Sequence, residues 1–260
     1  MSEVSPARIQ SYFREVARKT YETVLCPPFT IFFHPTDPLV HFNYAIPDEP
    51  VSGDLAEPLD RLVDAFTKRG RTPRFELVEA FAPGLGASLA ARGFQEEGRP
   101  FLMCCLPATA RPVAPPEGIT LQKLTDESPD DDIRSLLSVA RRAFGMSDGP
   151  VSDADLAWNR KALGAAPAFL ARQDGLPVAA ANLLAPIGGL AEVAGVATLE
   201  SHRRRGIGAA LTSAAVTEGF SRGVDAVVLS AADERAGRVY RSVGFEPYGF
   251  VLACSSPSPS

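Results

Sequence analysis

Histidine and cysteine are scarce in this sequence, which has three and four of them among 260 residues. The cysteines contain no Cys-x-x-Cys pair, and no histidine–cysteine cluster has metal-ligand spacing. We therefore expect no metal site, and the scattered histidines indicate no catalytic triad. Cysteines without an evident pairing pattern are typical of a reducing compartment, so we expect a cytoplasmic protein.

An excess of positive charge and long apolar runs are also missing. The net charge of −5 argues against a nucleic-acid partner, which requires a basic face. Residues 1–20 have no apolar core of signal-peptide length. The least charged stretch, residues 175–197, is interrupted by Asn182, Glu192, prolines and glycines. It predicts neighbouring buried strands with a turn at 186–189 rather than a membrane span.

Proline marks the organisation of the chain. Residues 106–118, "LPATARPVAPPEG", hold four prolines in thirteen positions and predict a linker. The linker separates a domain at 1–105 from one at 119–254, and "SSPSPS" at 255–260 predicts a disordered tail. Strand and helix patterns alternate in the second domain, which predicts an α/β (α+β) fold around one sheet.

The two halves contain a weak internal repeat. Residues 65–78 resemble 219–231, and "SLAARGF" at 88–94 resembles "VYRSVGF" at 239–245. Each half is therefore expected to end in strand, helix, Gly-Phe and strand, as two diverged copies of one fold. The alternative is that Gly-Phe is a common helix end followed by a core aromatic.

The segment "SHRRRGIGAAL" at 201–211 leads from a predicted strand into a predicted helix. The first turn of a helix leaves backbone N–H groups unpaired and carries partial positive charge. Gly206 and Gly208 would let a phosphate approach these amides, and the three preceding arginines would add charge. A pyrophosphate group therefore fits this loop, although a basic surface turn could carry the same residues.

Other phosphate-binding motifs do not match. Leu211 stands where a dinucleotide-binding fingerprint needs its third glycine, and the Gly-Lys-Ser/Thr of a P-loop is absent. The order Arg203-x-x-Gly206-x-Gly208 instead resembles the coenzyme A pyrophosphate loop of the GCN5-related N-acetyltransferases (GNAT family). "DERAGRVYRSVGF" at 233–245 adds Tyr240 shortly before Gly-Phe, as in that family.

This resemblance covers residues 118–253 and implies two tandem GNAT-like domains, each a mixed, mostly antiparallel central sheet flanked by helices. The first copy lacks the Arg-x-x-Gly-x-Gly loop, and Leu89 stands where Tyr240 stands in the second. We therefore expect the first copy to be degenerate. The family's activity implies direct transfer of acetyl from acetyl-CoA to a primary amine of a small molecule. We expect a monomer or homodimer with no membrane or nucleic-acid partner.

The resemblance also implies roles for individual residues. Tyr240 would protonate the departing thiolate, and Glu192 would accept the proton of the amine. Many members carry asparagine in place of Asp233, so an amide that donates and accepts is replaced here by an acceptor. The implied coenzyme A contacts are Val196, Ala197, Thr198, Arg203, Arg204, Arg205, Gly206, Ile207, Gly208, Ala209 and Asp233.

Several alternatives stay open at this point. Glu192 could be a solvated carboxylate at a strand end, and Tyr240 could be a core aromatic. The chain as a whole could be a non-catalytic acyl-CoA-binding sensor or scaffold, or a protein N-acetyltransferase.

Overall fold

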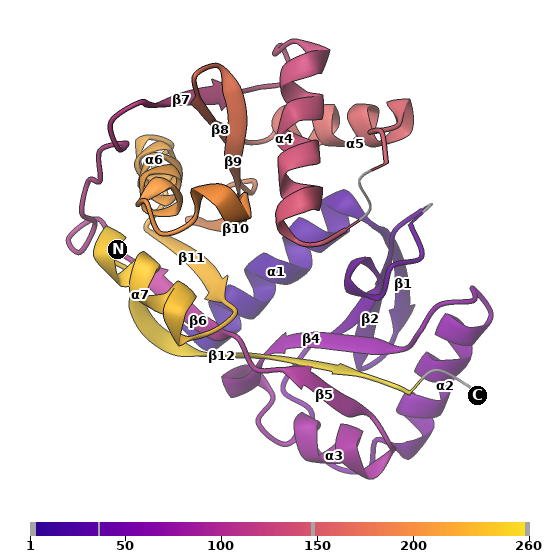
Figure 1. Ribbon diagram of the computed structural model, residues 1–260. Helices are drawn as coiled ribbons and strands as arrows, with labels where there is room; N and C mark the ends of the chain where they lie inside the picture. The colour runs from indigo at the N-terminus through magenta and orange to yellow at the C-terminus, as the bar shows by residue number, and fades with distance from the viewer. Residues whose placement is uncertain (1–3, 36, 147–148, 258–260) are drawn as a thin grey trace. The chain divides into compact units, whose positions relative to one another are not determined.

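The chain folds into two structural units (Figure 1). The computed structural model describes residues 4–35, 37–146 and 149–257. The first unit runs to Leu102 and resumes at Tyr248, and the second unit comprises residues 103–247. Each unit has its own cluster of buried apolar side chains.

The sheet of the first unit is mostly antiparallel. β1, β2 and β3 pair antiparallel, β3 pairs with β4 in parallel, and the end of β12 pairs antiparallel with β4 and β5. The elements are α1 (Pro6–Thr20), β1 (Glu22–Cys26), β2 (Phe29–Phe33), η1 (Val40–Phe42), β3 (Tyr44–Pro47), α2 (Ala56–Thr67), β4 (Arg74–Val78), η2 (Glu79–Phe81), α3 (Leu85–Ala91), β5 (Gln95–Gly98) and the end of β12 (Glu246–Ser255).

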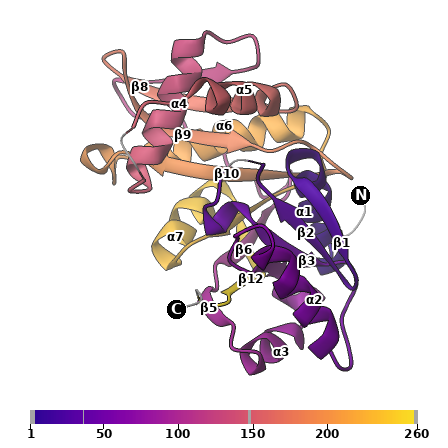
Figure 2. The same cartoon turned by 90° about the vertical axis from the view of Figure 1, so that its right-hand side faces the viewer.

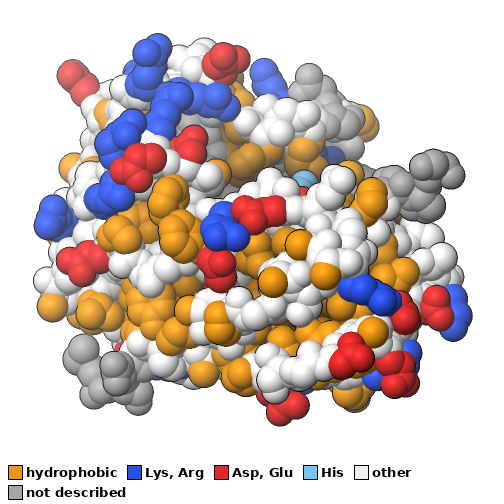
Figure 3. All heavy atoms as spheres, turned by 90° about the horizontal axis from the view of Figure 1, so that it is seen from below, with side chains coloured by type: hydrophobic (Ala, Val, Ile, Leu, Met, Phe, Trp, Pro, Cys, Tyr) orange, Lys and Arg blue, Asp and Glu red, His pale blue; other side chains and the backbone are white. Residues whose placement is uncertain are grey.

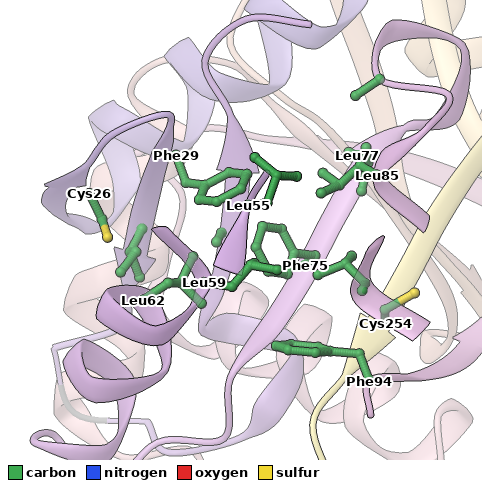
Figure 4. Packing of buried hydrophobic residues seen from close by; sticks show 14 of the residues in the cluster. Cys26, Phe29, Leu55, Leu59, Leu62, Phe75, Leu77, Leu85, Phe94 and Cys254 are labelled. Carbon is green, nitrogen blue, oxygen red and sulfur yellow. The ribbon is translucent and has the colours of Figure 1, made fainter. Parts of the chain in front are cut away.

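Helices cover both faces of this sheet. Every residue of β2 is buried, as expected for a strand with both faces covered. Phe29 and Phe75 pack edge to face, with ring centroids 5.0 Å apart, in the cluster that includes α2 and α3 (Figure 4). Phe32 belongs to a separate cluster with Ala17 of α1. The alternation of side chains along β2 therefore places α1 opposite α2 and α3.

In the second unit the strands lie in the order β6-β11-β10-β9-β8-β7. β7, β8, β9 and β10 pair antiparallel, whereas β10 and β11 are parallel. The elements are β6 (Phe101–Cys105), β7 (Ile119–Leu124), α4 (Asp130–Ala143), α5 (Asp153–Leu163), β8 (Ala168–Gln173), β9 (Leu176–Leu183), β10 (Leu190–Thr198), η3 (Glu200–His202), α6 (Ile207–Ser221), β11 (Ala226–Ala231) and α7 (Glu234–Val243).

Two helices lie on opposite faces of this second sheet (Figures 1 and 2). α4 buries its apolar side chains in one cluster with α5 and with Leu170 and Ala180 of the sheet. α6 packs on the other face, where a Cβ placed on Gly219 would lie 3.8 Å from the side chain of Leu183. Because strand side chains alternate, Ala180 and Leu183 mark the two faces of β9.

Both halves of the chain end their last helix in the same way. A glycine with positive φ follows both α3 and α7. The Phe94 N–H donates to the Leu89 carbonyl at 3.0 Å, and the Phe245 N–H donates to the Tyr240 carbonyl at 3.1 Å. The two helix ends therefore have the same geometry, as the predicted repeat requires, and Leu89 takes the position of Tyr240.

The structural units differ from the predicted domains at 1–105 and 119–254. Met103–Cys105, the end of β6, belongs to the second unit, where β6 neighbours β11. β12 belongs to the first unit from Tyr248 onward and pairs there with β4 from Val251 to Ser255. Each half thus contributes strand residues to the unit formed mainly by the other half.

The predicted linker and tail are more ordered than their composition indicated. Within residues 106–118, the Arg111 N–H donates to the Val243 carbonyl at 2.8 Å, and the Val113 N–H donates to the Ser213 hydroxyl at 2.9 Å. In the predicted tail at 255–260, Ser255 ends β12, and the Ser256 N–H donates to the Pro73 carbonyl at 2.8 Å. Residues 258–260 of the tail lie outside the described residues.

Charged side chains of both signs are interspersed on the face shown in Figure 3, with basic side chains gathered near one edge of that view. Among the helices that the structure describes, none combines the length and the apolar character needed to cross a membrane.

Candidate functional site

Two parallel strands separate in the middle of the second unit. β10 and β11 pair at three positions, the last being Glu192↔Val228. Beyond this pair, β10 continues to Thr198 and β11 to Ala231 without a recorded pairing to each other. The carboxyl ends of parallel strands are a common place for a ligand, and here the separation leaves polar backbone groups of β10 without a β11 partner.

β10 is irregular just after this point. Its register with β9 shifts between Ala194 and Ala197, and Gly195 has a φ of +61°. A bulge of this kind removes a residue from the ladder and bends the strand. Of the predicted coenzyme A contacts on this strand, Val196 therefore lies in the bulge, whereas Ala197 and Thr198 pair with β9.

The three arginines that follow β10 have different surroundings. Arg203 donates from Nε to the carbonyl at the end of β10 and from Nη2 to the carbonyl at the end of α4, both at 3.1 Å. Arg205 donates from Nη1 to Oε1 of Gln173 at 2.9 Å. Both of these side chains hold the loop in place. Arg204 is exposed and makes no hydrogen bond or ion pair with another described residue, so its charge is available to a ligand.

The start of α6 offers unpaired backbone amides. Gly206 is the N-cap residue with a φ of +81°, and among the described residues no side chain is found to cap the helix. The Ala210 N–H donates to the Gly206 carbonyl at 3.1 Å, so the N–H groups of Ile207, Gly208 and Ala209 precede the first helical hydrogen bond. A Cβ on Gly208 would meet nothing closer than 3.8 Å. This arrangement fits a pyrophosphate group.

β10 directs its side chains to both faces of the sheet. A Cβ on Gly208 would lie 3.8 Å from the side chains of both Val196 and Thr198, which places these two residues on the α6 face. Glu192 and Ala194 lie on the α4 face by the alternation of the strand. The amides of α6 and the Glu192 carboxylate are therefore on opposite faces of β10, and the pairing with β11 ends beside Glu192.

Tyr240 lies on α7, which packs beside α6 (Figure 1). Its ring meets that of Phe245 edge to face, with 6.2 Å between centroids. The hydroxyl has no hydrogen-bond partner among the described residues. Burial, and then the negative charge of Asp233, raise the pKa of Tyr240. The phenol therefore keeps its proton at neutral pH and can donate it.

Asp233 has a structural role that the sequence did not indicate. It is the N-cap residue of α7, and its Oδ1 accepts a hydrogen bond from the Ala236 N–H at 2.7 Å. One carboxylate oxygen is thus committed to the helix end, and the charge acts on Tyr240 from there.

No thiol is placed to act as a nucleophile. All four cysteines are free and buried, and burial raises the pKa of Cys105, the cysteine at the end of β6. A buried, protonated thiol is inert toward acyl groups. In the part of the chain that the structure describes, no group of three or more histidine, cysteine, aspartate or glutamate side chains could hold a metal ion.

Sequence reasoning did not single out one polar side chain at the bulge. Asn182 of β9 lies opposite Ala194, and its Nδ2 is 3.0 Å from the position that a Cβ on Gly195 would take. The signal available in the sequence was a lone asparagine in the apolar run "VAAANLLA".

Comparison with known proteins finds a family match within the second half of the chain. The acetyltransferase (GNAT) family model matches residues 133–245. Among curated proteins, none matches the sequence significantly. The structure is similar to a GCN5-related N-acetyltransferase from Kribbella flavida, with a TM-score of 0.81 and 29% identity over 99% of this chain and 98% of that one.

Two further solved structures share the fold over most of the chain. A GCN5-related N-acetyltransferase from Sphaerobacter thermophilus has a TM-score of 0.67 and 20% identity, over 94% of this chain and 84% of its own. A tandem GNAT protein from the clavulanic acid biosynthesis pathway has a TM-score of 0.63 and 17% identity, over 89% of this chain and 79% of its own. These likenesses support the expected fold of two tandem GNAT-like domains.

Proposed function

We propose that this chain is an acetyl-CoA-dependent N-acetyltransferase, because the acetyltransferase (GNAT) family model matches its residues 133–245. Its acceptor is the primary amine of a small molecule, and the acetyl group passes to that amine directly. The observation that carries the proposal is the set of uncapped amides at the start of α6, which lies at the end where β10 and β11 separate.

The residues at this end of the sheet fit coenzyme A. The N–H groups of Ile207, Gly208 and Ala209 would bind the pyrophosphate, and the free guanidinium of Arg204 would add charge–charge attraction. The bulge of β10 would offer its unpaired backbone to the amide-containing arm of the cofactor. Coenzyme A would supply an acetyl group activated as a thioester.

Protons would be handled on the two faces of β10 by different residues. An alkyl amine with a pKa near 10 is protonated by roughly a thousand to one at pH 7, so it must lose a proton before attack. Glu192, on the α4 face, would accept that proton. Tyr240, which lies beside α6 and retains its proton, would donate that proton to the thiolate that leaves as the C–S bond breaks. The proton that the nitrogen loses on becoming an amide would pass to solvent.

The surroundings of Glu192 favour a slender acceptor. Glu192 and Ala194 are only partly exposed, on a face that α4 covers. A small aliphatic amine can reach such a carboxylate more easily than a folded protein segment can. Direct transfer is supported by the burial of Cys104 and Cys105, the two cysteines of β6, which is the strand next to β11.

The test is to mix the protein with acetyl-CoA and a panel of small primary amines, and to follow free thiol together with the mass of the acetylated amine. The protein is kept at catalytic concentration because its own four cysteines are free thiols. We expect one thiol for each N-acetyl product. Tight acetyl-CoA binding in calorimetry without any product would instead favour a non-catalytic sensor.

A further inference from the structure

Asn182 is a polar side chain in an otherwise apolar part of β9. The residues around it in the strand, from Val178 to Ala181 and Leu183, are buried, whereas Asn182 is only partly buried. Neither end of its amide has a hydrogen-bond partner among the described residues. An asparagine kept in such a strand without internal partners is available to a ligand.

The backbone of β10 at Gly195 leaves room for the Asn182 side chain. Its Nδ2 lies 3.0 Å from the position of a Cβ on Gly195, closer than a real Cβ would normally tolerate. Gly195 also has a φ of +61°, which disfavours residues with a side chain. A glycine at this bulge thus provides both the turn of the strand and the room for the asparagine amide.

Asn182 and Glu192 lie on the same face of the sheet. Asn182 is directly opposite Ala194, and Glu192 is two residues before Ala194 on the same strand. Such diagonal neighbours in an antiparallel pair are about 7–8 Å apart between Cα atoms, within reach of one small ligand. Both side chains lie on the α4 face, opposite the uncapped amides of α6.

We propose that Asn182 contacts the acceptor amine and, with Glu192, selects primary over secondary amines. This inference rests on the proposed acetyl transfer. The ammonium of a primary amine has three N–H groups. After it passes one proton to one oxygen of Glu192, it can donate one remaining N–H to the other oxygen of that carboxyl group and one to Oδ1 of Asn182, while its lone pair stays free to attack. A secondary amine keeps only one N–H after this transfer, so when it donates to Glu192 it leaves Oδ1 of Asn182 unpaired, which a partly buried site penalises.

The kinetic test compares n-butylamine with N-methylbutylamine. Asn182→Ala should raise the KM for n-butylamine about tenfold and leave the KM for acetyl-CoA unchanged. It should also reduce the wild-type preference for the primary amine by a similar factor, because only the primary amine loses a hydrogen bond. The matched control is Asn159→Ala, since the amide of Asn159 donates to a carbonyl of its own helix, that of Asp155, at 2.9 Å.

A binding measurement separates this inference from the proposed activity. The assigned side-chain NH₂ resonances of Asn182 in the wild-type protein, saturated with coenzyme A, are followed during titration with n-butylamine. We expect them to shift, with N-methylbutylamine giving a weaker response. If the Asn182 resonances shift but no acetyl transfer is detected, amine binding at Asn182 is supported and the proposed activity is contradicted. An unchanged resonance, or an unchanged preference for primary amines in Asn182→Ala, would overturn the assignment.

Discussion

The proposed role of Tyr240 as a proton donor depends on where α7 places the side chain. Its phenol is largely buried beside Phe245, its hydroxyl has no partner among the described residues, and burial and Asp233 both raise its pKa. A purely structural tyrosine in such surroundings would normally use its hydroxyl in a hydrogen bond. The unpaired hydroxyl therefore favours the catalytic interpretation over the core aromatic that the sequence left open.

Tyr240→Phe removes the proton and keeps the ring. We expect kcat to fall about 10- to 1,000-fold, because an alkyl thiolate with a pKa near 8.5 leaves without help, but more slowly. The affinity for acetyl-CoA should change little, since the amides of α6 are untouched. The check is kcat by thiol release and Kd by calorimetry on one preparation. Wild-type turnover combined with a lowered Tm would assign Tyr240 to the core.

Asp233→Asn tests the charge that acts on this phenol. The substitution removes a negative charge that disfavours phenolate, so the pKa of Tyr240 should fall toward its ordinary value of about 10. A donor is active while protonated and is lost as pH rises through its pKa, so the alkaline limb of kcat should move to lower pH. Asparagine caps a helix as well as aspartate does, so the Tm should stay close to wild type. If the alkaline limb of the pH profile of kcat does not move, a group other than Tyr240 is the proton donor.

At the scale of elements, the start of α6 is the feature on which the proposed binding of coenzyme A depends. Gly208→Glu places a carboxylate in the first helical turn, where it competes with phosphate for the same amides. We expect at least a 100-fold loss of coenzyme A affinity in calorimetry with an equal or higher Tm, because an acidic residue there stabilises a helix. Gly208→Ala is the control, since its Cβ has 3.8 Å of room and adds no charge. Equal affinity for both variants would move the phosphate site away from α6.

Local elements of the second unit follow from the sequence because their signals are local. Arg-x-x-Gly-x-Gly lies between β10 and α6, Asp174–Gly175 turns between β8 and β9, and Gly-Phe ends α7 as predicted. The different roles of Arg203 and Arg204 could not be predicted from the local sequence. The Arg203 guanidinium donates a hydrogen bond to a carbonyl at the end of α4, 60 positions away in sequence, and no local pattern encodes such a contact.

At the scale of the whole molecule, the assignment of strands to units was beyond sequence reasoning. Alternating or continuous apolar residues define a strand and its buried faces, but they do not specify which neighbour it pairs with. The pairing of β12 with β4 joins residues more than 170 positions apart, and "SSPSPS" carries a composition typical of disorder although its first residue ends a strand. The repeat was visible because both copies kept the Gly-Phe helix end.

The first unit has filled the positions that the second unit leaves open. β3 and β4 are its parallel pair, recorded only at Ala45↔Phe75. Near their carboxyl ends the fully buried side chain of Gln10, from α1, accepts a hydrogen bond from the Val78 N–H at 2.7 Å. At the start of α2, Asp54 accepts the Ala56 N–H at 2.9 Å, where α6 has free amides. A carboxylate at that helix start repels phosphate.

Coenzyme A should therefore bind once per chain, although the chain holds two copies of the fold. In the first unit, the backbone amides at the corresponding positions already donate hydrogen bonds within the protein. The Val78 N–H at the end of β4 donates to Gln10, and the Ala56 N–H at the start of α2 donates to Asp54. Calorimetry of the wild-type chain with coenzyme A should give a stoichiometry near one. Gly208→Glu should bring it to zero, because no second site remains to be measured. Two equivalents in the wild-type chain, or one surviving equivalent in Gly208→Glu, would show that the first copy still binds the cofactor.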